Sequence, residues 1–102
     1  MVYPFKGPFS YDSDTVSDWD SKTIGVYYCG FKDTDGKLTI YYIGRAIGDG
    51  GVKARLLQHL NENKWRDVTH FGYHFCDTDK EAIDHEAAEI KLYKPKYNTQ
   101  GV

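Results

Sequence analysis

Two apolar stretches, Thr23-Ile-Gly-Val-Tyr-Tyr-Cys-Gly-Phe31 and Leu38-Thr-Ile-Tyr-Tyr-Ile-Gly44, decide the fold of this chain. Both are rich in β-branched and aromatic residues, which favour β-strands. Between them lies Lys32-Asp-Thr-Asp-Gly-Lys37, in which Asp35 and Gly36 tolerate the positive φ of a tight turn. The sequence therefore predicts a β-hairpin.

A first helix is expected after the hairpin, from about residue 52 to residue 61. The loop before it, Gly48-Asp-Gly-Gly51, offers Asp49 as a candidate cap. Apolar side chains recur along one side of this segment at helical spacing, namely Val52, Leu56, Leu57 and Leu60. This pattern is typical of a helix that packs against a sheet.

A third strand and a second helix complete the pattern. Residues 65–76 alternate loosely between apolar and polar side chains, as a strand does. Thr78 followed three residues later by Glu81 is a capping-box signature, which opens a helix over residues 79–93 that stops before Pro95. The order β-β-α-β-α predicts an α+β fold, in which helices flank a three-stranded, mainly antiparallel sheet.

Residues 1–22 are expected to form an irregular amino-terminal arm, and residues 23–102 the folded domain. The arm mixes Pro4, Gly7 and Pro8 with aromatic residues and then four aspartates, and it has no sustained period of 2 or 3.6. Its aromatic residues stand two and four positions apart, so part of the arm is expected to lie extended against the domain.

Length and composition favour one soluble domain. The chain has 102 residues and a formal charge of −2, and no uncharged run approaches the roughly 18 residues of a membrane helix. Residues 37–66 hold six Lys or Arg against two acidic residues, a local charge of +4 that can attract a polyanion. The sequence pI of about 6.0 is nevertheless far below that of dedicated nucleic-acid binders. Two cysteines make no disulfide framework, so a reducing compartment, the cytoplasm, is expected.

Glu86 is poorly explained by a purely structural interpretation. On a helical wheel it falls inside the apolar arc, of about 140°, of the second predicted helix. A carboxylate in apolar surroundings costs several kcal/mol unless it is paired or binds a metal. Glu86 therefore indicates either a structural ion pair or a functional site.

Arg55 and His59 lie four residues apart on one stripe of the first predicted helix, at the margin of its apolar face. They can serve one cleft, because Arg55 suits a phosphate or carboxylate and His59 can transfer a proton near neutral pH. The structural alternative is that Arg55 pairs with Glu86 and that His59 is a residue of the rim.

The other histidines and the tyrosine pairs give weaker signals. His70 and His74 share one face of the third predicted strand, and with His85 they suggest zinc, although this spacing is weakly diagnostic without cysteines or an acidic partner. In Tyr27-Tyr28 and Tyr41-Tyr42, adjacent rings are expected on opposite faces of each strand, one inward and one outward.

Five motifs in order resemble those of the GIY-YIG nuclease domain: Gly25-Val26-Tyr27, Tyr42-Ile43-Gly44, Arg55 with His59, Glu86, and Pro95-Lys96-Tyr97-Asn98. The resemblance covers roughly residues 23–98 and includes the β-β-α-β-α order. Val26 stands in place of an isoleucine, and Arg45 stands where many members have lysine. In this family the glutamate that matches Glu86 holds the single catalytic metal, which would account for its position on the apolar arc.

The resemblance implies a role for each matching residue. Tyr27 and Tyr42 would line the site, and one of them would position or deprotonate the attacking water. Arg55 would bind the scissile phosphate and stabilise the transition state. His59 would assist in proton transfer or phosphate contact, and Asn98 would hold the site through hydrogen bonds.

The resemblance also implies a cofactor and contacts to the substrate. Glu86 would bind Mg²⁺ or Mn²⁺, hard ions that take one or two carboxylates and keep several waters. Arg45 and Lys53 would join Arg55 in contacting DNA phosphates. A phenol with a pKa near 10 is a poor base unless cations lower that pKa, and Arg45, Arg55 or the metal could do so.

The implied activity is that of a metal-dependent endonuclease, which hydrolyses DNA phosphodiester bonds with one metal ion. Duplex or branched DNA is the expected substrate, a targeting protein or a homodimer is a possible further association, and no membrane partner is expected. Repair, restriction, mobile-element and phage nucleases all use this domain, and the sequence does not rank them. The alternative, favoured by the net charge of −2, is a non-catalytic module that keeps the fold to bind DNA or a protein.

Overall fold

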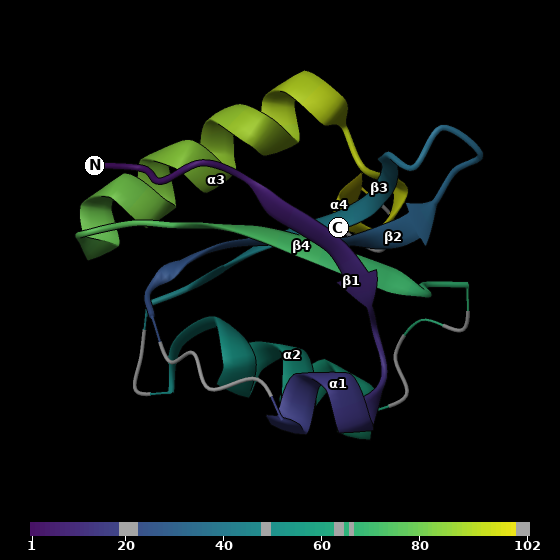
Figure 1. The fold of residues 1–102 in the computed structure, drawn as a ribbon. Helices are drawn as coiled ribbons and strands as arrows, with labels where there is room; N and C mark the ends of the chain where they lie inside the picture. The colour runs from purple at the N-terminus through teal and green to yellow at the C-terminus, as the bar shows by residue number, and fades with distance from the viewer. Residues whose placement is uncertain (19–22, 48–49, 63–64, 66, 100–102) are drawn as a thin grey trace.

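A four-stranded antiparallel sheet with helices on both faces forms the centre of the molecule (Figure 1). The structure is a computed structural model that describes residues 1–18, 23–47, 50–62, 65 and 67–99. The strands are β1 (Lys6–Ser10), β2 (Gly25–Lys32), β3 (Leu38–Ala46) and β4 (His70–Phe75), and the helices are α1 (Ser13–Asp18), α2 (Gly51–Asn61), α3 (Asp79–Tyr93) and α4 (Lys96–Thr99). The strand order across the sheet is β1-β4-β2-β3. The predicted α+β class with flanking helices is confirmed, but the sheet has four strands rather than three.

The fourth strand comes from the segment that was expected to be irregular. β1 pairs antiparallel with β4, and the short helix α1 packs beside α2. The pairing shifts register between Lys6 and Phe9, and this irregularity removes the period of 2 by which a sequence pattern reveals a strand. Phe9 lies against Phe71 and Tyr73 of β4, with ring centroids 5.6 and 5.8 Å apart. The expectation that part of the arm lies extended against the domain is thus confirmed, but this part is a paired strand of the sheet rather than an irregular segment.

The predicted hairpin is confirmed as the antiparallel pair β2 and β3. In its turn, Oδ1 of Asp33 accepts hydrogen bonds from the backbone N–H groups of Asp35 and Lys37, and Gly36 has a φ of 82°. A register shift opposite Cys29 and Gly30 adds one residue to β3. Because of it, Tyr41 and Tyr42 both pack against the same core cluster, and the prediction that they face opposite ways is wrong.

Both predicted helices are confirmed, with boundaries within one residue of those expected. The capping box of α3 is present: the Thr78 side chain accepts from the backbone N–H of Glu81, whose carboxylate accepts from the backbone N–H of Thr78. Gly50 stands at the N-cap of α2, and the candidate cap Asp49 lies outside the described residues. The third predicted strand is shorter than residues 65–76, and α4 was not predicted.

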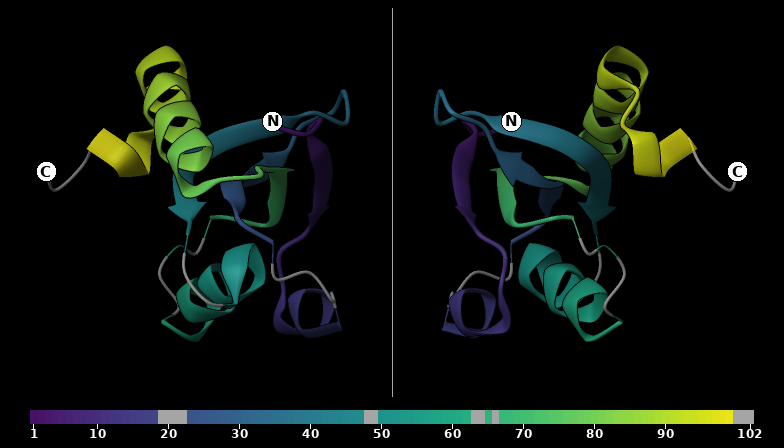
Figure 2. Two further views of the ribbon diagram at one scale, coloured as in Figure 1. Left: turned by 90° about the vertical axis from the view of Figure 1, so that its left-hand side faces the viewer. Right: turned by 90° about the vertical axis from the view of Figure 1, so that its right-hand side faces the viewer.

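Two core clusters fill the spaces on either side of the sheet. α1 and α2 cover one face and α3 covers the other, as the two views of Figure 2 show. Tyr27 belongs to the cluster beneath α2, and its neighbour Tyr28 to the cluster beneath α3. Both rings are buried, with 0% and 2% of their surfaces exposed, so neither points outward as was predicted. Within the described part of the chain, no helix combines the length and apolar character that a membrane crossing requires.

Candidate functional site

A buried hydrogen bond between Tyr27 and His59 forms the centre of the candidate site. Tyr27 lies on the central strand β2, and its hydroxyl is 2.8 Å from Nε2 of His59 on α2. His59 is 4% exposed, so it is a buried residue rather than the rim residue of the structural alternative. A phenol can donate this bond and a neutral imidazole can accept it, so a proton can pass between the two side chains.

Gly44 makes room for the Tyr27 hydroxyl. The two residues are directly opposite each other in the pairing of β2 with β3. A Cβ atom at Gly44 would lie 2.4 Å from both the hydroxyl oxygen and Cζ of Tyr27, a distance that no side chain can adopt without moving the ring. The position of the Tyr27 ring thus requires a glycine at position 44.

An aromatic wall flanks this pair and consists of Tyr42, Trp65 and Tyr97. The Trp65 ring lies 4.6 Å from that of Tyr42, 4.7 Å from that of His59 and 5.9 Å from that of Tyr97, on which it stacks. Trp65 was not among the predicted site residues. The available signal was its place between Lys64 and Arg66, because aromatic residues interleaved with basic ones are typical of surfaces that bind nucleic acids.

Burial raises the pKa of Tyr27 and of Tyr42 above the usual value for tyrosine. For Tyr27, burial is the largest cause, and the positive charge of Arg55 acts in the opposite direction. Arg55 also opposes the shift at Tyr42. Arg55 thus lowers the pKa of both phenols, as was considered for a nearby cation, but burial outweighs its effect, and both phenols are protonated at neutral pH.

Arg55 lies at the exposed edge of this group. It is one helical turn before His59 on α2, as predicted, and its Nη1 donates to Oε1 of Gln58 at 3.1 Å. Lys53 is a partly buried residue two positions earlier on the same helix. The guanidinium thus combines exposure to solvent with influence on the buried tyrosines, an arrangement suited to an anionic ligand.

Glu86 forms an ion pair with Arg45, not with Arg55. Nη1 of Arg45 on β3 is 2.7 Å from Oε1 of Glu86 on α3, and the Glu86 side chain is only 13% exposed. The predicted inward position of this carboxylate is confirmed. Its negative charge contributes to the raised pKa of Tyr42, so its field reaches the aromatic wall.

The Glu86 carboxylate is also a chemically suitable ligand for the implied Mg²⁺ or Mn²⁺. These ions need few protein ligands, since they retain several waters and bind through one or two carboxylates. Arg45 contacts Oε1, which leaves Oε2 as the ligand atom. The donor set therefore fits a singly anchored, hydrated cation.

Asn98 holds α4 against β3. Its Oδ1 accepts from the backbone N–H of Ile43 and its Nδ2 donates to the backbone carbonyl of Ile43, both at 2.8 Å. Ile43 stands between Tyr42 and Gly44, so this pair of hydrogen bonds fixes the strand segment that borders the site. Asn98 thus connects α4 to the strand that carries Tyr42, and its role in a reaction remains a prediction.

The structure brings Tyr27, Tyr42, Arg55 and His59 together, with Glu86 beside Tyr42. Of the three histidines that suggested zinc, the structure brings His74 and His85 together but leaves His70 apart from them. His70 is turned toward the hydroxyl of Thr69, 2.8 Å from its Nδ1, whereas His74 and His85 lie together on the far face of the sheet.

Comparisons of the chain with models of known families, with curated proteins and with solved structures find no match. Any functional assignment therefore depends on the residues and geometry of the chain itself.

Proposed function

We propose that this chain is a metal-dependent endonuclease that hydrolyses DNA phosphodiester bonds by a one-metal mechanism of the GIY-YIG type. The observation that carries the proposal is the buried Tyr27–His59 hydrogen bond, with the Arg55 guanidinium beside it. A proton acceptor and a fixed positive charge next to one hydroxyl are what an attack by water on a phosphodiester requires.

In the proposed reaction, Tyr27 relays a proton. Its raised pKa makes a preformed phenolate unavailable at neutral pH. Because Tyr27 is 0% exposed, the step requires that bound DNA brings the attacking water to its hydroxyl, which then passes its proton to Nε2 of His59 as it takes one from the water. The water oxygen forms a bond to phosphorus, and the bond from phosphorus to the leaving sugar oxygen breaks. Arg55 binds the phosphate oxygens, whose negative charge is redistributed during the attack.

Glu86 would hold the cation through Oε2. A bound Mg²⁺ or Mn²⁺ would polarise the phosphate and stabilise the leaving oxygen. Without a cation, Arg45 balances the charge of this mostly buried carboxylate. With a cation on Oε2, Arg45 would keep its bond to Oε1, and its half-exposed side chain would also contact a DNA phosphate.

The proposed substrate is DNA and the proposed location is the cytoplasm. Duplex or branched DNA would lie along Lys53 and Arg55 of α2, with the aromatic wall available for base stacking. A cytoplasmic location is supported by the state of Cys29 and Cys76, which are both free and buried.

The decisive experiment measures nicking of a supercoiled plasmid and cleavage of a branched oligonucleotide with Mg²⁺, Mn²⁺ or EDTA. Glu86→Gln keeps the shape of the side chain and removes its charge, and should lower the rate at least about 100-fold. Asp84→Asn, at an exposed position on the same helix, is the matched control and should cut like the parent. Equal cleavage by the Glu86→Gln variant, or cleavage that persists in EDTA, would contradict the proposal.

A second candidate, a non-catalytic binding module, is favoured by the ion pair itself. If Glu86 serves only to neutralise the charge of Arg45, it needs no metal ion. The domain would then bind DNA through its basic and aromatic side chains without cleaving it. Salt-dependent DNA binding that is unchanged by EDTA, without cleavage of either substrate, would support this candidate.

A further inference from the structure

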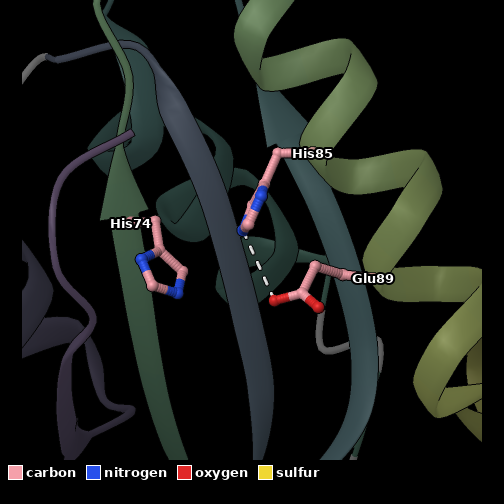
Figure 3. Close-up of side chains that lie close together, drawn as sticks. All are labelled: His74, His85 and Glu89. Atoms are coloured by element: carbon pink, nitrogen blue, oxygen red, sulfur yellow. Dashed lines mark ion pairs between the residues drawn. The ribbon is translucent and has the colours of Figure 1, made fainter. Parts of the chain in front are cut away.

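A second group of metal-ligating side chains lies on the opposite face of the sheet from Tyr27 and His59. His74 projects from β4, and His85 and Glu89 project from α3 one helical turn apart (Figure 3). One ligand atom from each of the three residues lies within 4.8 Å of the other two. Within the described residues this is the one group of three or more such side chains that meets this distance.

We propose that His74, His85 and Glu89 bind a divalent transition-metal ion, with Zn²⁺ as the best-matched ion. Two imidazoles and one carboxylate form a donor set that suits zinc, whereas Mg²⁺ prefers oxygen ligands alone. This site is separate from the carboxylate of Glu86 and does not depend on the nuclease proposal.

One separation between ligand atoms already matches that of a tetrahedral zinc site. Zinc bonds of about 2.0–2.2 Å place neighbouring ligand atoms about 3.4 Å apart at tetrahedral angles. Nε2 of His85 and Oε1 of Glu89 are already 3.4 Å apart. The group would close around an ion if separations of up to 4.8 Å shortened to this value, a movement of at most about 1.4 Å.

Hydrogen bonds around the group orient its ligand atoms. Nδ1 of His74 is 2.7 Å from the backbone carbonyl of Tyr3, and a carbonyl only accepts, so Nδ1 carries the proton and Nε2 keeps its lone pair. The buried hydroxyl of Tyr28 donates to Oε1 of Glu89 at 2.7 Å. A histidine that donates its other N–H to a carbonyl and a carboxylate that accepts a hydrogen bond are the usual outer partners of zinc ligands.

An open cavity gives this group access to solvent. It has a volume of about 230 Å³, and its lining includes His74 and Glu89 together with apolar side chains such as Leu38 and Ile40. Three protein ligands leave one tetrahedral position for a water or another small donor, and the cavity has room for it. The surroundings are partly buried, with His85 27% and Glu89 16% exposed, so competition from bulk water is reduced.

The test measures Zn²⁺ binding to the untagged, full-length chain by calorimetry and by competition with a chromophoric chelator. We expect one ion per chain. His85→Ala and Glu89→Gln should each weaken binding at least about tenfold. Tyr28→Phe, which removes the hydroxyl that donates to Glu89 and lies 3.3 Å from Nε2 of His85, should weaken it about tenfold. His70→Ala is the matched control, because His70 lies on the same strand and outside the group.

Two further readouts keep the test independent of folding. Co²⁺ in place of Zn²⁺ should give the visible absorption of a tetrahedral site in the parent and in His70→Ala, and not in His85→Ala. Zn²⁺ should raise the melting temperature of the same two proteins. No Zn²⁺ binding by the folded parent, or equal affinity in His70→Ala, His85→Ala and Glu89→Gln, would overturn the proposal.

Discussion

At the scale of single residues, the candidate site depends on the close fit of Tyr27 between two neighbours. The ring fills the space that the missing side chain of Gly44 leaves, and the hydroxyl meets His59. Position and partner are thus set by separate contacts, one steric and one polar. Substitutions can test them one at a time.

Tyr27→Phe removes the hydroxyl and keeps the ring. We expect DNA cleavage to fall at least about 100-fold, since the proton path to His59 is lost, while the free energy of unfolding decreases by only about 1 kcal/mol. Plasmid nicking and thermal unfolding measure the two effects. Parental cleavage by this variant would exclude the relay.

Gly44→Ala, in contrast to Tyr27→Phe, should mainly lower the free energy of unfolding. The added methyl group would overlap the Tyr27 ring, and such overpacking typically costs about 1–3 kcal/mol. Chemical denaturation measures this cost. Gly36→Ala in the hairpin turn is an instructive comparison, because no atom lies within 4 Å of the added methyl group and only its positive φ of 82° is strained. An unchanged stability of Gly44→Ala would mean that the Tyr27 ring moves freely.

For single residues, the sequence predicts the direction in which a side chain points better than it predicts the residue that the side chain contacts. The helical wheel placed Glu86 inward, which is confirmed. It could not identify Arg45 as the partner, because a wheel describes one helix and the partner lies on a distant strand. Trp65 was missed for a similar reason, since its contacts come from three other segments of the chain.

At the scale of helices and strands, short sequence motifs correctly predicted the features that depend on residues close together in the chain. The capping box of Thr78 and Glu81 and the turn at Asp35-Gly36 both depend on residues within five positions of one another, and both are confirmed. β1 was predicted only as an extended segment and not as a strand of the sheet, because its pairing depends on β4, 60 or more residues away, and its register shift hides its period.

Thr78→Ala should destabilise α3 from its amino-terminal end. The substitution removes the side-chain acceptor for the backbone N–H of Glu81, and loss of such a cap costs about 1 kcal/mol. Urea unfolding measures the change. Lys91→Ala, at an exposed position later in α3, is the control and should have little effect. Equal midpoints for the two variants would contradict a stabilising role for the cap.

The stability that Asp67 contributes should depend on pH. Hydrogen bonds from Lys96 and Tyr97 hold the pKa of this carboxyl below its ordinary value of 3.8. Because the folded-state pKa is the lower one, the contribution is complete above pH 3.8 and is lost as the pH falls through the folded-state pKa. The melting temperature of Asp67→Asn should thus be lower than that of the parent near neutral pH, with a difference that shrinks in strong acid. A constant difference across this range would contradict the assignment.

At the scale of the whole molecule, the amino-terminal segment is part of the sheet rather than an addition to it. β1 covers the edge of β4, and the carbonyl of Tyr3 holds the ring of His74. Exposed strand edges pair readily with other chains, so β1 also protects the sheet from association.

Deletion of residues 1–10 should lower the melting temperature by at least about 8 °C, as expected for a loss of about 2 kcal/mol from a domain of this size. The exposed β4 should also promote self-association, which light scattering during size-exclusion chromatography measures. Phe9→Ala, which keeps the strand and removes its contacts with Phe71 and Tyr73, should fall between the parent and the deletion. A monomeric deletion variant with the melting temperature of the parent would contradict this view of β1.

The consecutive tyrosines of β2 connect the two faces of the molecule. Tyr27 contacts His59 on one side of the sheet, and Tyr28 contacts Glu89 on the other. If strand β2 shifted by a single residue, both hydroxyls would exchange faces at once, and neither group of side chains would keep its partner. If an ion bound near Tyr28 changes the affinity for a phosphate near Tyr27, thermodynamic linkage requires that the phosphate change the affinity for the ion by the same factor.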